Sequence, residues 1–588
     1  RRFDSCDSPV LEAQCWSPDS ALEWDCECDV AVVGFGGAGA SAALEAREQG
    51  VNVCLLERYT GGGSTVISGG IFYAGGGTAV QREAGIEDDP ENMLNYLRQE
   101  VKGAVSEPTL RRFCEQSVEN YEWLEGHGVE FNAARCPFKT SYPSNSYYYY
   151  FSGNESYPPY ADIARPAPRG HRAHQKGISG EAFFEPLRQA CSDAGVDIRT
   201  QTRVDGLIAD AEGQVVGLSA TTLRGRGPAA WLHRNLYRLL IWLHYVTMGV
   251  PLLQGLLRRA LNGLENRFGQ RVNIRVRKGV VLSTGGFYFN RDMVEQHAPA
   301  YTAGMPLGTI GDDGSGIDLG QSVGGRTAMM DHVSAWRFMN PPETFVKGVM
   351  VNRQGERFTN EMYYGAKIAE QMVREHDGKA WLIIDRKLWR ETWNVLGPQR
   401  TMWFQAAFAV VYLLLERTRG RTIEDLARKL DMPVQQLRNT IEEYNRVASA
   451  GIEDPLGKPA THLQPLEEGP YYALNASYDC AWVRCPSLTM GGLAVDEESG
   501  EVLGDDGKPI RGLYAAGRTA VGIPSRSYVS GLSIADCVFA GRRAGRHAAE
   551  RGRAKAAGRV QKVVASAVAG EEGSFADASV AEGVCAES

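Results

Sequence analysis

The sequence predicts an α/β fold, and three observations lead to this prediction. Residues 26–290 alternate strand and helix patterns, which is typical of sheets covered by helices. A glycine-rich turn joins the first of these strands to the first helix. Many of the 67 glycines among the 588 residues cluster in loops, as expected where backbone must approach a ligand closely.

The first unit has the order strand, turn, helix, strand and acid. Asp29–Gly34 has a strand pattern, and Gly34–Gly39 follows it as a G-x-G-x-x-G turn. A helix through Ala42–Glu48 leads to a second strand, Val51–Leu56, which ends at Glu57. Such a turn lets a pyrophosphate approach the helix N-terminus, and the acid hydrogen-bonds an adenosine ribose. The predicted dinucleotide-binding residues here are Gly34, Gly36, Gly37, Ala38, Gly39, Glu57 and Arg58.

Composition and charge exclude several classes of protein. Hydrophobic residues make up 43% of the chain and charged residues 23%, as in ordinary globular proteins. The net charge of −8 argues against nucleic-acid binding. The twelve cysteines lack the spacing of a disulfide framework or a zinc site. We therefore expect reduced thiols, no metal site and a cytoplasmic protein.

Later segments resemble one flavoprotein superfamily. They are Gly61–Thr65, Ser68–Gly70, Val280–Phe287, Leu513–Gly517 and Ser530–Gly545. They are similar to the flavin-wrapping loop, the "ATGGF" strand and turn, the closing strand and the final helix of the fumarate reductase/succinate dehydrogenase flavoproteins. The resemblance covers about residues 26–550, except for residues 223–272.

This resemblance implies a Rossmann-like ββα FAD-binding domain interrupted by a substrate cap domain with α+β structure. It places the FAD-binding domain at 26–290 and 471–550 and the cap at 291–470. The residues themselves predict an irregular leader at 1–25 and, from a composition rich in Ala, Gly, Glu and Ser, a disordered tail at 551–588. Residues 312–316 are interpreted as a turn against the flavin. The further cofactor-binding residues that it implies are Gly62, Gly63, Ser64, Thr65, Ser68, Gly69, Gly70, Thr284, Gly285, Gly286, Gly517, Arg518, Ser533 and Ile534.

The mode of FAD attachment also follows from the resemblance. Relatives that bind FAD covalently use a histidine in the glycine-rich loop after the first βαβ unit. Residues 57–80 contain no histidine. We therefore expect non-covalent FAD.

Three positions of the resemblance bear on the chemistry. Dicarboxylate reductases of the superfamily place two arginines and a histidine there, because two substrate carboxylates must be neutralised in a dry pocket. This chain has Gly365, Leu488 and Tyr528 instead. A pocket without these cations favours a neutral, apolar substrate with a carbonyl and argues against a dicarboxylate or acrylate reductase.

The pattern is similar to the 3-ketosteroid dehydrogenases of the superfamily. Tyr528-Val529-Ser530-Gly531 resembles their Δ4-(5α) type more than their Δ1 type, whose motif has two glycines spaced after the tyrosine. The resemblance implies loss of a C4 proton and a C5 hydride from a 3-ketosteroid. Tyr528 would donate to the C3 carbonyl and Ser530 would accept the proton. Tyr364, or as second choice Tyr363, would relay it.

The same residues suit other functions as well. They would serve the reverse reaction, in which a 3-keto-4-ene steroid, a bile acid or another enone is reduced. The fold also occurs in proteins that act only as binding scaffolds, although a complete set of FAD motifs disfavours that reading. The electron acceptor and the direction of the reaction stay open.

Residues 223–272 interrupt the pattern. Val215–Ala220 and Val272–Arg277 are predicted to be neighbouring strands, although about fifty residues separate them. Within this connection, Leu239–Leu257 contains no Asp, Glu, Lys or Arg. From Arg224 to Lys278 the chain has eleven Lys and Arg but one acid, Glu265.

The apolar stretch is long enough for a membrane span, but Gly249 and Pro251 interrupt it and no return path exists. We instead predict a monotopic amphipathic insertion, with arginines that meet anionic head groups. Thr401–Leu415 is a second apolar run that would join it. The protein would then lie peripherally on the inner face of the membrane. A subunit interface or additional core is the alternative, and an oligomer is possible.

Overall fold

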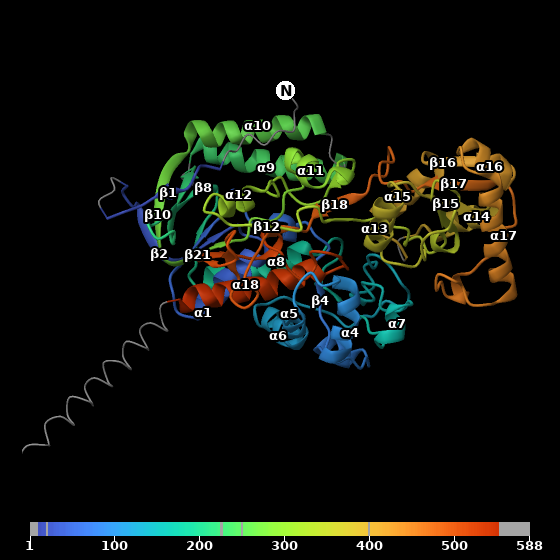
Figure 1. Cartoon of the computed structure of the whole chain (residues 1–588), viewed down its shortest axis with the longest axis horizontal. Helices are drawn as coiled ribbons and strands as arrows, with labels where there is room; N and C mark the ends of the chain where they lie inside the picture. The colour runs from blue at the N-terminus through green and yellow to red at the C-terminus, as the bar shows by residue number, and fades with distance from the viewer. Residues whose placement is uncertain (1–9, 19–21, 224–226, 248–250, 398–399, 552–588) are drawn as a thin grey trace, which may run out of the picture.

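The computed structural model describes residues 10–18, 22–223, 227–247, 251–397 and 400–551. The side chains of residues 244–254 and the predicted disordered tail beyond residue 551 lie outside the described residues. Within the described residues, the α/β prediction is confirmed. One large sheet lies at one end of the molecule, and the cap with its smaller sheet lies at the other (Figure 1).

The large sheet has nine strands in the order β1-β8-β9-β10-β2-β3-β7, with β21 beside β10 and β20 beside β21. Its strands are β1 (Gln14–Cys15), β2 (Cys26–Val33), β3 (Val53–Leu56), β7 (Asp197–Arg199), β8 (Thr202–Ala209), β9 (Val215–Thr222), β10 (Gln270–Leu282), β20 (Glu501–Leu503) and β21 (Pro509–Ala515). The central β2 is parallel to β3 and β10, and its Val30–Val33 run is buried. Continuous apolar runs are typical of parallel strands covered on both faces.

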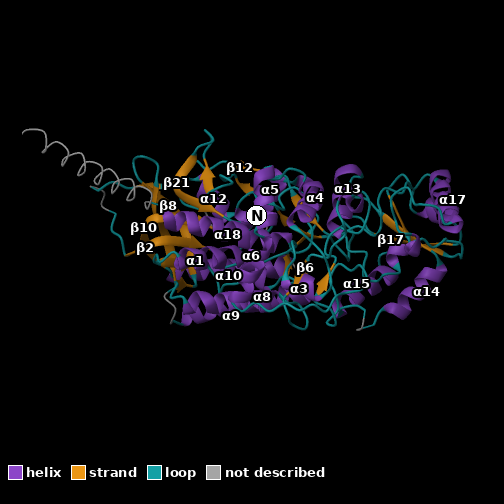
Figure 2. Cartoon of the chain, turned by 90° about the horizontal axis from the view of Figure 1, so that it is seen from below, coloured by secondary structure: helices purple, strands orange, loops and turns teal. Residues whose placement is uncertain are grey.

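Two helices cross this sheet in close contact (Figures 1 and 2). They are α1 (Gly37–Glu48) and α18 (Leu532–Glu550). A Cβ atom on Gly541 would lie 2.5 Å from the Ala38 carbonyl oxygen, and one on Gly545 would lie 2.2 Å from that of Ala42. Glycines in α18 therefore allow the two backbones to touch. This contact places the N-termini of both helices at the same end of the sheet.

The cap has a four-stranded antiparallel sheet in the order β14-β15-β17-β16. Its strands are β14 (Val349–Val351), β15 (Trp381–Ile384), β16 (Arg417–Gly420) and β17 (Tyr471–Asn475). The helices around it are α13 (Gly365–Glu375), α14 (Arg386–Val395), α15 (Trp403–Leu414), α16 (Ile423–Lys429) and α17 (Val434–Ala450). They form the right-hand end of Figure 1.

Two sequence-predicted boundaries need correction. The cap does not end at residue 470, because β17 pairs with β15 and β16 in the cap sheet. The leader is not wholly irregular, because Gln14–Cys15 pairs with Ile208–Ala209 at the sheet edge. In both cases a short strand becomes visible only through a partner that is far away in the sequence.

The insertion is a helical hairpin. Helix α9 (Pro228–Thr247) and helix α10 (Pro251–Phe268) connect β9 to β10. Ala220 lies opposite Val272 in an antiparallel pair, so the predicted neighbouring strands are confirmed. No helix in the described part of the chain has both the length and the apolar character that crossing a bilayer requires.

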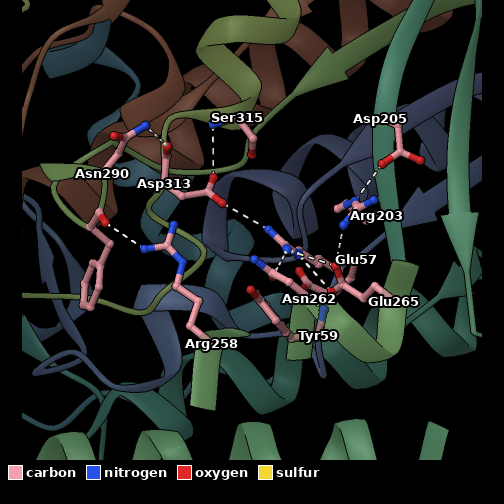
Figure 3. Close-up of polar contacts among 12 residues, drawn as sticks. Glu57, Tyr59, Arg203, Asp205, Arg258, Asn262, Glu265, Asn290, Asp313 and Ser315 are labelled. Atoms are coloured by element: carbon pink, nitrogen blue, oxygen red, sulfur yellow. Dashed lines mark hydrogen bonds and ion pairs between the residues drawn. The ribbon is translucent and has the colours of Figure 1, made fainter. Parts of the chain in front are cut away.

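The single acid of the insertion attaches the hairpin to the large sheet (Figure 3). Glu265 is 3% exposed and lies 2.9 Å from Arg58, 2.7 Å from Arg203 and 3.1 Å from His233. Burial opposes its charge, but these partners hold the pKa of Glu265 well below its usual range. Close by, the Tyr59 ring stacks on Tyr237 of α9 at 4.3 Å between centroids. The hairpin is therefore anchored at Arg58 and Tyr59, which directly follow Glu57.

Replacing Glu265 with alanine is expected to destabilise the protein. The change leaves two arginines short of a carboxylate, although Asp313 and Asp205 remain beside them. We expect the free energy of unfolding to fall by about 3 kcal/mol, measured by denaturant unfolding at neutral pH. The matched control is Glu122→Ala on an exposed helix face. Equal stabilities of the two variants would show that Glu265 does not anchor the hairpin.

Candidate active site

One cavity of about 500 Å³ runs from the glycine-rich turn of the large domain to the cap. Its size and its position between two domains are typical of cofactor and substrate sites. Segments that are far apart in the sequence meet around it. The sequence-predicted residues that line it are Gly34, Gly36, Gly37, Ala38, Glu57, Arg58, Gly63, Ser64, Thr65, Ser68, Gly69, Thr284, Gly285, Gly517, Arg518, Ser533, Ile534, Tyr364, Tyr528 and Ser530.

At the end of the cavity near the large sheet, backbone donors surround Glu57. Its carboxylate accepts hydrogen bonds from the backbone N–H of Phe35 at 2.9 Å and of Tyr59 at 2.7 Å. Burial raises the pKa of Glu57, and the two backbone donors oppose that shift. A carboxylate has room for further donors, so Glu57 fits a ribose as well. Helix α1 starts at the same place, where a pyrophosphate would meet its N-terminus.

Asp312 joins the segments at the middle of the cavity. Its carboxylate accepts from Gly286 N at 3.0 Å, from Arg518 Nη2 at 2.6 Å and from the hydroxyl of Ser64. The Nη1 atom of Arg518 is buried and has no hydrogen-bond partner in the described structure. A donor of this kind beside the cavity matches an acceptor atom of a bound flavin. The residues present therefore fit FAD.

Five predicted residues do not line the cavity: Gly39, Gly62, Gly70, Gly286 and Tyr363. The four glycines shape the loops around it. A Cβ on Gly39 would lie 1.9 Å from the Gly34 carbonyl oxygen, and one on Gly70 would lie 2.3 Å from that of Ser179. Gly62 donates to Phe35 O at 2.6 Å, and Gly286 donates to Asp312. Gly39 and Gly70 therefore have no room for a side chain, and Gly62 and Gly286 hold their turns through backbone hydrogen bonds.

Three hydroxyl side chains gather where the cofactor end meets the cap. Tyr364 and Tyr528 have ring centroids 6.5 Å apart, and Ser530 lies in the same cavity lining. Burial raises the pKa of Tyr528 to about 12, and the backbone N–H of Gly531 partly opposes this. The phenol therefore remains protonated at neutral pH and acts as a hydrogen-bond donor.

The sequence did not single out Tyr150 for this cluster. The Tyr150 hydroxyl lies 3.2 Å from Ser530 Oγ, and burial raises its pKa. Tyr150 belongs to strand β5 (Tyr149–Tyr150), whose successive side chains point in opposite directions. Tyr149 instead donates to Pro168 O at 2.6 Å. Residues 147–150 are four consecutive tyrosines, and only strand pairing selects one of them for the cluster.

Tyr363 lies apart from the cluster. Its hydroxyl donates to Pro158 O at 2.7 Å, and its ring packs against Tyr160. Of the two tyrosines after Glu361, the structure therefore brings only Tyr364 to the cavity. Tyr363 and Tyr364 are adjacent in the turn before α13, and their side chains point in different directions.

The cap end of the cavity is mainly apolar. Leu488 and Tyr528 line it, and the Trp336 ring meets Tyr528 edge to face at 5.2 Å. Gly365 begins α13 and adds no side chain. Further aromatic residues of the lining are Phe338, Phe345, Trp403, Phe404, Phe408 and Tyr412. This end therefore suits a large apolar molecule better than a dicarboxylate.

Comparison with known proteins agrees with this geometry. A model of the FAD binding domain family matches residues 29–531. A 3-oxo-5-alpha-steroid 4-dehydrogenase of Comamonas testosteroni is 38% identical over 519 residues, which cover 87% of this chain and 96% of that one. A probable fumarate reductase of Shewanella frigidimarina is 26% identical over 536 residues, or 89% of this chain and 74% of that one.

A solved structure shows the same similarity. The 3-ketosteroid-Δ4-(5α)-dehydrogenase of Rhodococcus jostii, in complex with 4-androstene-3,17-dione, has a TM-score of 0.76 and 31% identity. The match covers 92% of this chain and all of that one. This chain is thus an FAD-dependent oxidoreductase that belongs to the FAD binding domain family and, within it, to the 3-ketosteroid dehydrogenases.

Proposed function

We propose that this enzyme converts a 3-keto-5α-steroid into the corresponding 4-en-3-one. A proton leaves C4, a hydride leaves C5, and a C4–C5 double bond forms. FAD, when bound, supplies the two-electron acceptor at flavin N5. The observation that carries the proposal is the cluster of Tyr528, Ser530 and Tyr364 between the cofactor end and the apolar cap end of one cavity.

Tyr528 is the proposed donor to the C3 carbonyl. Removal of the C4 proton develops negative charge on that oxygen, and a fixed phenol in a dry site stabilises it. Because burial raises the Tyr528 pKa to about 12, the phenol holds its proton while it donates. The carbonyl would then lie at the cluster, with the steroid rings toward the apolar wall.

Ser530 is the proposed proton acceptor, with tyrosines as the relay. Tyr150 lies 3.2 Å from Ser530 Oγ, and contact with Ser530 partly opposes the burial that raises the pKa of Tyr364. An unassisted serine is a weak base, so neighbouring hydroxyls must pass the proton on. The Nζ atom of half-buried Lys139 lies 5.9 Å from the Tyr364 ring centroid and favours negative charge there.

The reverse reaction uses the same groups. Tyr528 would then polarise the enone carbonyl, Ser530 would return the C4 proton, and reduced FAD would supply the hydride for C5. Anaerobic mixing separates the two directions. Bleaching of the flavin by 5α-androstane-3,17-dione supports dehydrogenation, whereas reoxidation of reduced enzyme by the 4-en-3-one alone supports the reductase.

Tyr528→Phe is expected to slow flavin reduction by a saturated 3-ketosteroid by about 100-fold or more, because one oxyanion donor is lost. The flavin content of the variant should match that of the wild type. Tyr363→Phe is the matched control, since the Tyr363 hydroxyl bonds Pro158 outside the cavity. Single-turnover stopped-flow measurements give both rates. Equal rates for wild type and Tyr528→Phe would remove Tyr528 from the mechanism.

FAD is expected to be bound without a covalent link, because residues 57–80 contain no histidine. Acid precipitation of the purified protein should leave the yellow colour in the supernatant. Colour that stays in the pellet after washing would contradict the prediction.

We further propose that the hairpin lies on the surface of an anionic membrane. Trp231, Trp242 and Leu256 on α9 and α10 are 63%, 58% and 50% exposed. Arg238 and Arg259 are exposed on the same helices. Such a mixture of apolar and basic side chains is typical of interfacial helices.

Helix α15 extends this surface toward the cavity. It lies on the same side of the molecule as the hairpin in both views (Figures 1 and 2). Trp403, at its start, is 73% exposed and also lines the cavity, so it lies at the mouth. A steroid dissolved in lipid would have a short path to the site.

The membrane proposal predicts sedimentation with anionic liposomes at low salt and release at high salt. Replacing Trp231 and Trp242 together with glutamine should weaken sedimentation, because both rings leave the interface. Ile163→Gln, at an exposed apolar position on another part of the surface, is the control. If the wild-type protein stays in the supernatant at low salt, the hairpin is better explained as a subunit interface.

A further inference from the structure

The cap end of the cavity contains a positive charge, on Arg484, that has no role in the proposed dehydrogenation. Trp336 packs on Tyr528 of the catalytic cluster. The next residue, Arg337, donates hydrogen bonds to Tyr412 and Val483. This end therefore lies beyond the catalytic cluster, away from the dinucleotide turn. The residues that form it are Phe345, Phe408, Ala409, Tyr412, Val483 and Arg484.

Arg484 is a half-buried cation in this lining. The structure gives its side chain no hydrogen bond and no ion pair with any described residue. Glu416 is near in the fold, but it accepts from the backbone N–H of Trp482 at 2.6 Å and from Asn475. Among the described residues, the guanidinium of Arg484 is thus a donor without an acceptor beside an apolar cavity.

Arg337 adds a second positive charge behind the same wall. It is 1% exposed and donates only to neutral acceptors: the hydroxyl of Tyr412, the carbonyl oxygens of Val483 and Ser477, and the sulfur of Cys480. Its Nε atom is buried without a partner. A buried cation without a carboxylate is costly, so this wall favours a nearby anion.

None of the acids in the described cavity lining is at the cap end. Glu57, Asp312 and Asp313 are the carboxylates in its lining. Asp312 and Asp313 pair with Arg518 and Arg58, and Glu57 accepts from the backbone. The described lining therefore has two arginines without a carboxylate partner at the cap end, and the cluster of Tyr528, Ser530 and Tyr364 lies between them and the acids.

We propose that the substrate is a 3-ketosteroid with a carboxylate at the end opposite its 3-keto group, and that Arg484 binds that carboxylate. The inference rests on the proposed function, which fixes the carbonyl at Tyr528. Because the steroid nucleus is rigid, its far end then points toward the cap. Arginine binds carboxylates through two parallel hydrogen bonds, and Arg337 strengthens the positive potential at the same wall.

The test compares 3-oxo-5α-cholan-24-oic acid with its methyl ester, in which a neutral ester replaces the charged carboxylate. We expect the wild-type holoenzyme to have the higher kcat/KM for the acid. In Arg484→Met, the ratio of acid to ester should fall by about 10- to 100-fold, because a charge-assisted hydrogen bond is lost. Arg484→Lys should recover part of the ratio. Arg390→Met, which removes an exposed cation of the cap outside the cavity, should keep the wild-type ratio.

Equilibrium binding of both compounds, followed by tryptophan fluorescence, tests Arg484 without turnover. Equal affinity of the wild type for acid and ester, or an equal loss for both in Arg484→Met, would overturn the inference. If the ester and 5α-androstane-3,17-dione reduce the flavin but the acid has no advantage, only the substrate class is wrong. If no 3-ketosteroid reduces the flavin while the acid still binds through Arg484, the proposed reaction is wrong and the anion site stands.

Discussion

The buried carboxylate of Asp312 is the constraint on which the site depends. A charged group that is 2% exposed must find donors inside the protein, and Asp312 finds them on Gly286, Arg518 and Ser64. These three residues follow three different strands or loops of the chain. Satisfying one carboxylate therefore brings together the flavin-wrapping loop, the turn after β10 and the turn after β21. The same contacts position Arg518 with a free donor beside the cavity.

The residues that line the cavity differ on the two sides of Asp312. Toward the large sheet it has backbone donors, a helix N-terminus and paired charges, as a dinucleotide requires. Toward the cap it has mainly aromatic and aliphatic walls, with the proposed catalytic hydroxyl groups at the boundary and Arg484 at the far end. The proposed catalytic residues lie where the two parts meet, so that a reacting C–H bond and a flavin can be held together while water is excluded.

The hairpin combines two opposite requirements. On its buried side, Glu265 forms ion pairs with Arg58 and Arg203. The Tyr237 ring on the same side stacks on Tyr59. Its exposed side has tryptophans and arginines. The buried contacts of the insertion therefore reach Arg58 and Tyr59, which directly follow Glu57.

The sequence by itself determined the parts whose signal is local. The turn from Gly34 to Gly39 and the acid at Glu57 follow from the strand–turn–helix–strand pattern, whereas Tyr528 and Ser530 were identified through the resemblance to a known family. The large sheet followed from apolar runs of the right length.

Only the tertiary structure decided the contacts between distant segments. It selected Tyr364 over Tyr363 and added Tyr150, because side-chain direction depends on the local strand and turn. It moved the cap boundary past residue 470, because β17 is a strand only through its partners. Among the described residues it gave Arg484 no acceptor, which no spacing predicts, since an ion pair depends on what the fold brings near.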